Sequence, residues 1–117
     1  MLLMLCACAP APASLRPGFD VELTPGTPVA GRELVIRLQA TGDDAGLLEG
    51  ATLDLEAHMT HPGMAPVVVR LREDAPHQYS ATMPVTMAGE WVLFVSGRLA
   101  DGRIVREEVA RATAVGE

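Results

Sequence analysis

The sequence predicts an all-β fold, a seven-stranded antiparallel sandwich of the immunoglobulin-like type. Segments in which apolar and polar residues alternate recur along the chain, and turn residues interrupt them about every eight to twelve residues. No stretch has helical periodicity. The 117 residues suffice for one domain with its own core. Because aromatic residues make up only 3% of the chain, this core must consist of Val, Leu, Ile, Ala and Met.

The N-terminal residues do not follow the strand pattern. Residues 1–8 are apolar and uncharged, which is typical of the end of a secretion signal, although a disordered apolar terminus is the alternative. Leu5-Cys6-Ala7-Cys8 is similar to a bacterial lipobox, so Cys8 is the predicted lipidation site. Residues 9–17 are rich in Pro and Ala and are expected to form an extended tether. The folded domain is predicted for residues 18–117.

Seven strands are predicted in this domain, each from alternating apolar and polar residues. Between them lie clusters of Gly, Pro, Asp and Thr, which are typical of turns. Trp91 is expected to anchor the core, as a single Trp usually does. The predicted strands cover residues 19–23, 31–40, 52–60, 66–72, 77–83, 90–96 and 103–110.

Residues 58–66 concentrate the side chains that can bind a soft metal. His58 and His61 supply imidazoles, and Met59 and Met64 supply thioethers. Thioethers suit Cu(I), and imidazole suits copper, zinc and nickel. The alternative is structural, because Met often fills gaps in a core and His on a strand is often solvated.

Strand order predicts where these side chains gather. In an antiparallel sandwich the connections alternate between the two ends, so residues 24–28, 61–66 and 84–89 should share one end. His61 and Met64 lie in the second of these connections and Met87 in the third. Scattered core filling would not place the methionines of the domain together in this way. The sequence therefore predicts a soft-metal site at this end of the sandwich.

Two more residues lie close to this end, each with an open alternative. Met83 ends the strand before Met87, but it keeps the inward phase of Tyr79 and Ala81, which also fits core packing. His58 falls on the polar face of its strand, where simple solvation explains it.

The motifs around these residues resemble the FixH/YtkA-like domain, a small periplasmic or surface-exposed β-sandwich. The resemblance covers roughly residues 19–109. Members have a strand that ends in a Met/His/Pro/Gly turn, here Met59-Thr-His-Pro-Gly-Met64, followed by an aromatic strand and a Met-x-Gly-x-Trp segment. Residues 79–83 are similar to the aromatic strand, and residues 87–93 are similar to the Met-x-Gly-x-Trp segment. FixH proteins are held by a transmembrane helix, whereas this chain has the lipobox-like start.

The resemblance implies copper handling or assembly of membrane respiratory complexes. By carry-over it implies five candidate copper ligands, which are His58, His61, Met64, Met83 and Met87.

These observations leave two functions open. The first is an extracytoplasmic, membrane-anchored copper-binding module, a Cu(I) chaperone or scavenger. The second is a metal-free, lipid-anchored interaction module that contacts a membrane partner through its Met-rich end. An enzyme is not expected, because the domain has no cysteine nucleophile, no Ser-His-Asp pattern and no phosphate-binding loop. The net charge of −6 argues against a nucleic-acid partner.

Overall fold

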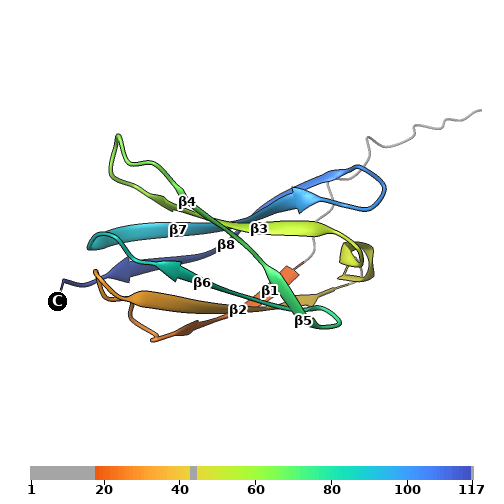
Figure 1. Cartoon of the computed structure of the whole chain (residues 1–117), viewed down its shortest axis with the longest axis horizontal. Helices are drawn as coiled ribbons and strands as arrows, with labels where there is room; N and C mark the ends of the chain where they lie inside the picture. The colour runs from red at the N-terminus through yellow and green to blue at the C-terminus, as the bar shows by residue number, and fades with distance from the viewer. Residues whose placement is uncertain (1–17, 43–44, 117) are drawn as a thin grey trace, which may run out of the picture.

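The computed structural model describes residues 18–42 and 45–116 of the chain. The predicted signal, the tether and Cys8 lie outside the described residues. The all-β prediction is confirmed: the described chain forms two four-stranded antiparallel sheets packed face to face (Figure 1). Within these residues no helix is long and apolar enough to cross a bilayer.

The first sheet has the strand order β1-β2-β6-β5 and the second has the order β4-β3-β7-β8. Side chains point alternately to the two faces of each strand, so every second residue of both sheets enters the space between them. The strands of the first sheet are β1 (Gly18–Thr24), β2 (Glu33–Thr41), β6 (Gln78–Pro84) and β5 (Arg72–Ala75). Those of the second are β4 (Val67–Arg70), β3 (Thr52–Met59), β7 (Gly89–Arg98) and β8 (Ile104–Ala114).

The core consists of aliphatic residues together with Met83, Tyr79 and Trp91, as the low aromatic content predicts. Trp91 is 3% exposed, which confirms its expected role as an anchor. In both sheets the buried side chains alternate with more exposed ones along the strand, as in β2 and β3. The fully buried large side chains are Ile36, Leu48, Leu55, Met83, Leu93, Val85, Val95 and Val105.

The strand count of seven was wrong, because the described residues form eight strands. The single strand expected at residues 66–72 is divided at Leu71, which leaves the second sheet and starts the edge of the first. The Leu71 N–H donates to the Leu53 carbonyl at 2.9 Å, and the Leu71 side chain is buried between the sheets. A chain that changes sheets at a buried residue keeps its alternation, so the sequence pattern does not reveal the break. The turn expected at residues 73–76 is consequently displaced, since Arg72–Ala75 forms β5.

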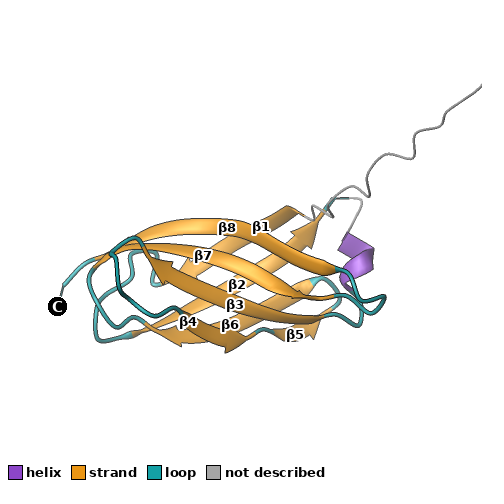
Figure 2. Cartoon of the chain, turned by 90° about the horizontal axis from the view of Figure 1, so that it is seen from above, coloured by secondary structure: helices purple, strands orange, loops and turns teal. Residues whose placement is uncertain are grey.

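The loop expected at residues 41–46 also differs in part. A short 3₁₀ helix covers Ala45–Leu48 and buries Ala45 and Leu48 in the core. The helix lies at the end of the sandwich opposite the β3–β4 and β6–β7 loops (Figure 2). It therefore closes the core at one end, while those loops close it at the other.

Candidate metal centre

Three loops lie at the same end of the sandwich, as strand alternation predicts (Figures 1 and 2). They join β1 to β2, β3 to β4 and β6 to β7. We call this end the cap and define it as residues 25–32, 60–66 and 85–88. Val115, just after β8, adds to it through hydrogen bonds with Pro28 and Ala30.

Two methionines of the cap are exposed to solvent. Met64 in the β3–β4 loop is 37% exposed, and Met87 in the β6–β7 loop is 39% exposed. Met is usually a core residue, whereas each of these two is more than one third exposed. The two loops that carry them lie at the same end of the sandwich.

Contacts beneath the two loops join the strand ends from which the loops start. The Trp91 indole N–H donates to the Met87 carbonyl at 3.0 Å, which fixes the β6–β7 loop to the core. Met59 pairs with Trp91 across the sheet. Its terminal methyl lies against Gly89, where an added Cβ would come within 2.9 Å of it and where φ is +131°. The Thr60 N–H donates to the Glu90 carbonyl at 3.2 Å, so the two loops start from a common support.

His61 has one ring nitrogen available for a ligand. Its Nδ1 lies 3.0 Å from the Pro62 carbonyl oxygen. Because a carbonyl only accepts hydrogen bonds, Nδ1 carries a proton, and in the neutral ring Nε2 then has the lone pair. Metal-bound histidines commonly have this arrangement, in which the second nitrogen donates to a backbone carbonyl. His61 is exposed, so Nε2 can bind an ion at the cap.

Met83 and His58, two of the predicted ligands, lie elsewhere. Met83 pairs with Leu34 across the first sheet and is 1% exposed, so its thioether packs in the core beneath the cap. His58 is on the outer face of the second sheet, on the side of β3 that faces solvent. The structure thus brings Met64, Met87 and His61 to the cap surface and leaves the other two outside it.

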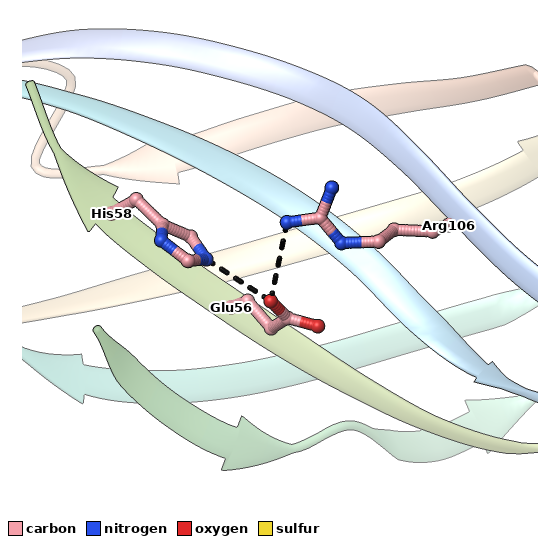
Figure 3. Close-up of polar contacts among 3 residues, drawn as sticks. All are labelled: Glu56, His58 and Arg106. Carbon is pink, nitrogen blue, oxygen red and sulfur yellow. Dashed lines mark hydrogen bonds and ion pairs between the residues drawn. The ribbon is translucent and has the colours of Figure 1, made fainter. Parts of the chain in front are cut away.

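His58 belongs to a charged cluster on that outer face (Figure 3). Its Nε2 donates to Glu56 at 3.0 Å, and Arg106 from β8 reaches the same carboxylate oxygen at 3.4 Å. The Arg106 guanidinium also lies 4.1 Å from the centre of the Phe94 ring, against which the His58 ring packs edge-on. We call Glu56, His58, Phe94, Ser96 and Arg106 the sheet-face cluster.

The carboxylate of Glu56 is stabilised by all its polar neighbours. A hydrogen bond from Ser96 contributes most to lowering the pKa of Glu56, and the bond from His58 and the charge of Arg106 lower it further. Burial acts in the opposite direction. The cluster is therefore a satisfied ionic network. Sequence reasoning missed it, because Arg106 is fifty residues from Glu56 and no spacing rule joins them.

Within residues 18–42 and 45–116, no group of three His, Cys, Asp or Glu side chains is arranged to hold a metal ion.

No family model matches this chain, and no curated protein matches it either. Solved structures do share its fold. CopC from Methylosinus trichosporium OB3b aligns with a TM-score of 0.55 over 87% of this chain and 96% of that one, at 14% identity. A superoxide reductase (neelaredoxin) from Ignicoccus hospitalis aligns with a TM-score of 0.55 over 86% of this chain and 80% of that one, also at 14% identity. At this identity the likeness establishes the shared β-sandwich fold.

Proposed function

We propose that the protein is an extracytoplasmic copper-binding module that holds Cu(I) at the cap. The single observation that carries this proposal is the pair of partly exposed methionines, Met64 and Met87, on two loops at the same end of the sandwich. The resemblance of the surrounding motifs to the FixH/YtkA-like domain supports copper as the ion. Binding, rather than catalysis, is the proposed activity.

Three neutral donors are assigned to the ion: the sulfur atoms of Met64 and Met87 and Nε2 of His61. This set of two thioethers and an imidazole suits Cu(I). Trp91 and Met59 position the loops from below, and Met83 fills the core beneath them. Because the donors lie on exposed loops, a bound ion can leave by ligand exchange, as a chaperone or scavenger requires.

Attachment to a membrane through a lipid on Cys8, with the tether of residues 9–17 as a spacer, belongs to the same proposal. It would keep the module close to a membrane complex, in agreement with the role in respiratory-complex assembly that the family resemblance implies.

Titration with Cu(I) tests the proposal. The full chain carrying Cys6→Ala and Cys8→Ala excludes thiolate ligands, and a chromophoric chelator reports competition for the ion. We expect one-to-one binding with a Kd of about a micromolar or less. The double substitution Met64→Leu and Met87→Leu keeps side-chain volume and should abolish binding without loss of the fold.

A matched control is Met83→Leu, the same change in the core beneath the cap. It should leave copper affinity within about threefold of the parent, because Met83 is not an assigned ligand. Copper affinity that is unchanged in the Met64/Met87 double variant would overturn the proposal.

The second candidate function is metal-free docking of a membrane partner on the cap. It is favoured by the exposed apolar side chains of Met64, Met87 and Val115 at one end of the molecule. Met64→Leu and Met64→Glu separate the two functions. Docking through apolar contact should survive Leu and be lost with Glu, whereas copper binding should weaken in both. Recovery of a cross-linked partner from the native membrane fraction, without added copper, measures docking.

A further inference from the structure

The methionines of the described residues differ widely in their exposure to solvent. Met64 and Met87, in the cap loops, are 37% and 39% exposed, whereas Met83 in β6 is 1% exposed. Met59, at the end of β3, is intermediate, and its terminal methyl lies within 2.9 Å of the place that a Cβ on Gly89 would take. The thioether group therefore occurs in this fold at three levels of solvent access.

Solvent access matters because hydroperoxides oxidise thioethers to sulfoxides. The sulfur lone pair attacks one peroxide oxygen, so an S–O bond forms as the O–O bond breaks. The departing hydroxide takes the proton of the transferred oxygen and leaves as water. The sulfur loses two electrons and the peroxide gains them. The product is polar, and methionine sulfoxide reductases convert it back to the thioether.

The position of the methionine decides what this oxidation does to the protein. At Met83 the new oxygen would be buried among the aliphatic side chains of the core, which would destabilise the fold. On the cap loops, water solvates the new oxygen, and surface changes of this kind alter stability little. The soft donor that suits Cu(I) is lost in either place. Oxidation confined to the cap would therefore remove two assigned ligands from a domain that stays folded.

We propose that Met64 and Met87 form a reversible oxidation site, at which a hydroperoxide switches off copper binding without unfolding the domain. The copper part of this inference rests on the proposed function. The fold supplies the selectivity of the modification, because Met83 and Met87 are only four residues apart in sequence and yet one is sealed in the core and the other is exposed.

Mapping of the sulfoxides tests the modification site without any metal. Hydrogen peroxide is added to the full chain, in which Cys6→Ala and Cys8→Ala remove the thiols. Cleavage after arginine then releases residues 38–70, with one cap methionine and the β3 methionine, and residues 73–98, with the other cap methionine and the β6 methionine. Each exposed methionine is thus compared with a less exposed one in the same peptide, and fragment masses assign every sulfoxide.

Met64 and Met87 should be oxidised at least about tenfold faster than Met83, with Met59 at an intermediate rate. Oxidation of Met83 as fast as that of the cap methionines would overturn the proposal. Protein that is oxidised only at the two cap methionines should keep its melting temperature within about 4 °C of the parent. Loss of its melting transition would likewise overturn the proposal.

The effect on binding is measured after the peroxide has been removed, by titration with Ag(I) as a soft ion that does not change its oxidation state. Oxidation at the cap should weaken Ag(I) binding at least about tenfold, and treatment with both types of methionine sulfoxide reductase should restore it. Met83→Leu is the matched control and should respond to peroxide as the parent does, because it lacks only the buried thioether.

Undiminished Ag(I) binding after complete oxidation of Met64 and Met87 would overturn the switch while leaving the proposed function in place. If the unoxidised chain bound neither Ag(I) nor Cu(I), the proposed function would be refuted and the switch with it. The two failures are therefore distinguished by the unoxidised protein alone.

Discussion

The cap and the sheet-face cluster each contain a histidine, but the two histidines have different surroundings. His58 and His61 are separated by two residues, yet His58 lies among a carboxylate, a guanidinium and an aromatic ring, whereas His61 lies in a charge-free loop. The Nε2 of His58 is occupied by Glu56, while the Nε2 of His61 is available. Surroundings, not residue type, therefore decide which histidine can serve an ion and which stabilises a sheet.

The methionines show the same contrast within the cap end. Met83 is completely buried beneath the loops, whereas Met64 and Met87 are each more than one third exposed. Substitutions that affect the core, the link between core and cap, or the sheet-face cluster should separate these roles.

The largest effect is expected for Met83→Ala. Removing a fully buried Met side chain leaves a cavity and should lower the free energy of unfolding by about 2–5 kcal/mol. Met64→Ala, the same change at an exposed site, should cost less than about 0.5 kcal/mol. Urea denaturation of both variants measures the difference, and equal costs would contradict the division between supporting and exposed methionines.

A smaller effect is expected for Trp91→Phe, which breaks the link between core and cap. The variant loses the indole hydrogen bond to the Met87 carbonyl and part of the buried ring, so stability should fall by about 1–2 kcal/mol. Amide hydrogen exchange should increase in residues 85–88. Tyr79→Phe is the control, because the Tyr79 hydroxyl has no hydrogen-bond partner within the described residues; similar exchange in both variants would contradict the link.

The smallest effect is expected for Glu56→Gln, which acts on the sheet-face cluster alone. Because the pKa of Glu56 is lower in the folded protein than its ordinary value of 4.5, its contribution to stability is fully present above that pH. It is lost as pH falls through the folded pKa.

The substitution should therefore lower the free energy of unfolding by about 1 kcal/mol at pH 7. The value is modest because the Arg106 side chain is half exposed to solvent. The difference from the parent should shrink steadily below pH 4.5. If the difference in free energy of unfolding between Glu56→Gln and the parent stayed the same in acid, the network would be held by packing rather than by charge.

Much of the fold could be predicted from the sequence, because alternation along a strand is a local property. The all-β class, the strand positions apart from the division at Leu71, and the buried Trp91 followed from patterns of a few residues each. The common end of the three loops followed from strand order. The division itself left no local signal, because Leu71 keeps the alternation while it changes sheets.

The ligand assignment stays a prediction, and the sequence narrowed it only to five residues. The alternation along a strand did not decide whether Met83 and His58 bind a metal. It shows to which face of the strand a side chain points, but not what covers that face. Only the tertiary structure decided that Met83 is sealed beneath the cap and that His58 pairs with Glu56.

The sequence by itself determined the alternating strands and the presence of thioethers and imidazoles in the loops between them. The tertiary structure decided which of these donors reach solvent and which charges meet, as when Arg106 reaches Glu56 from two strands away. The physical reason is that burial and ion pairing depend on contacts between distant segments. Periodicity and turn chemistry depend on neighbours along the chain.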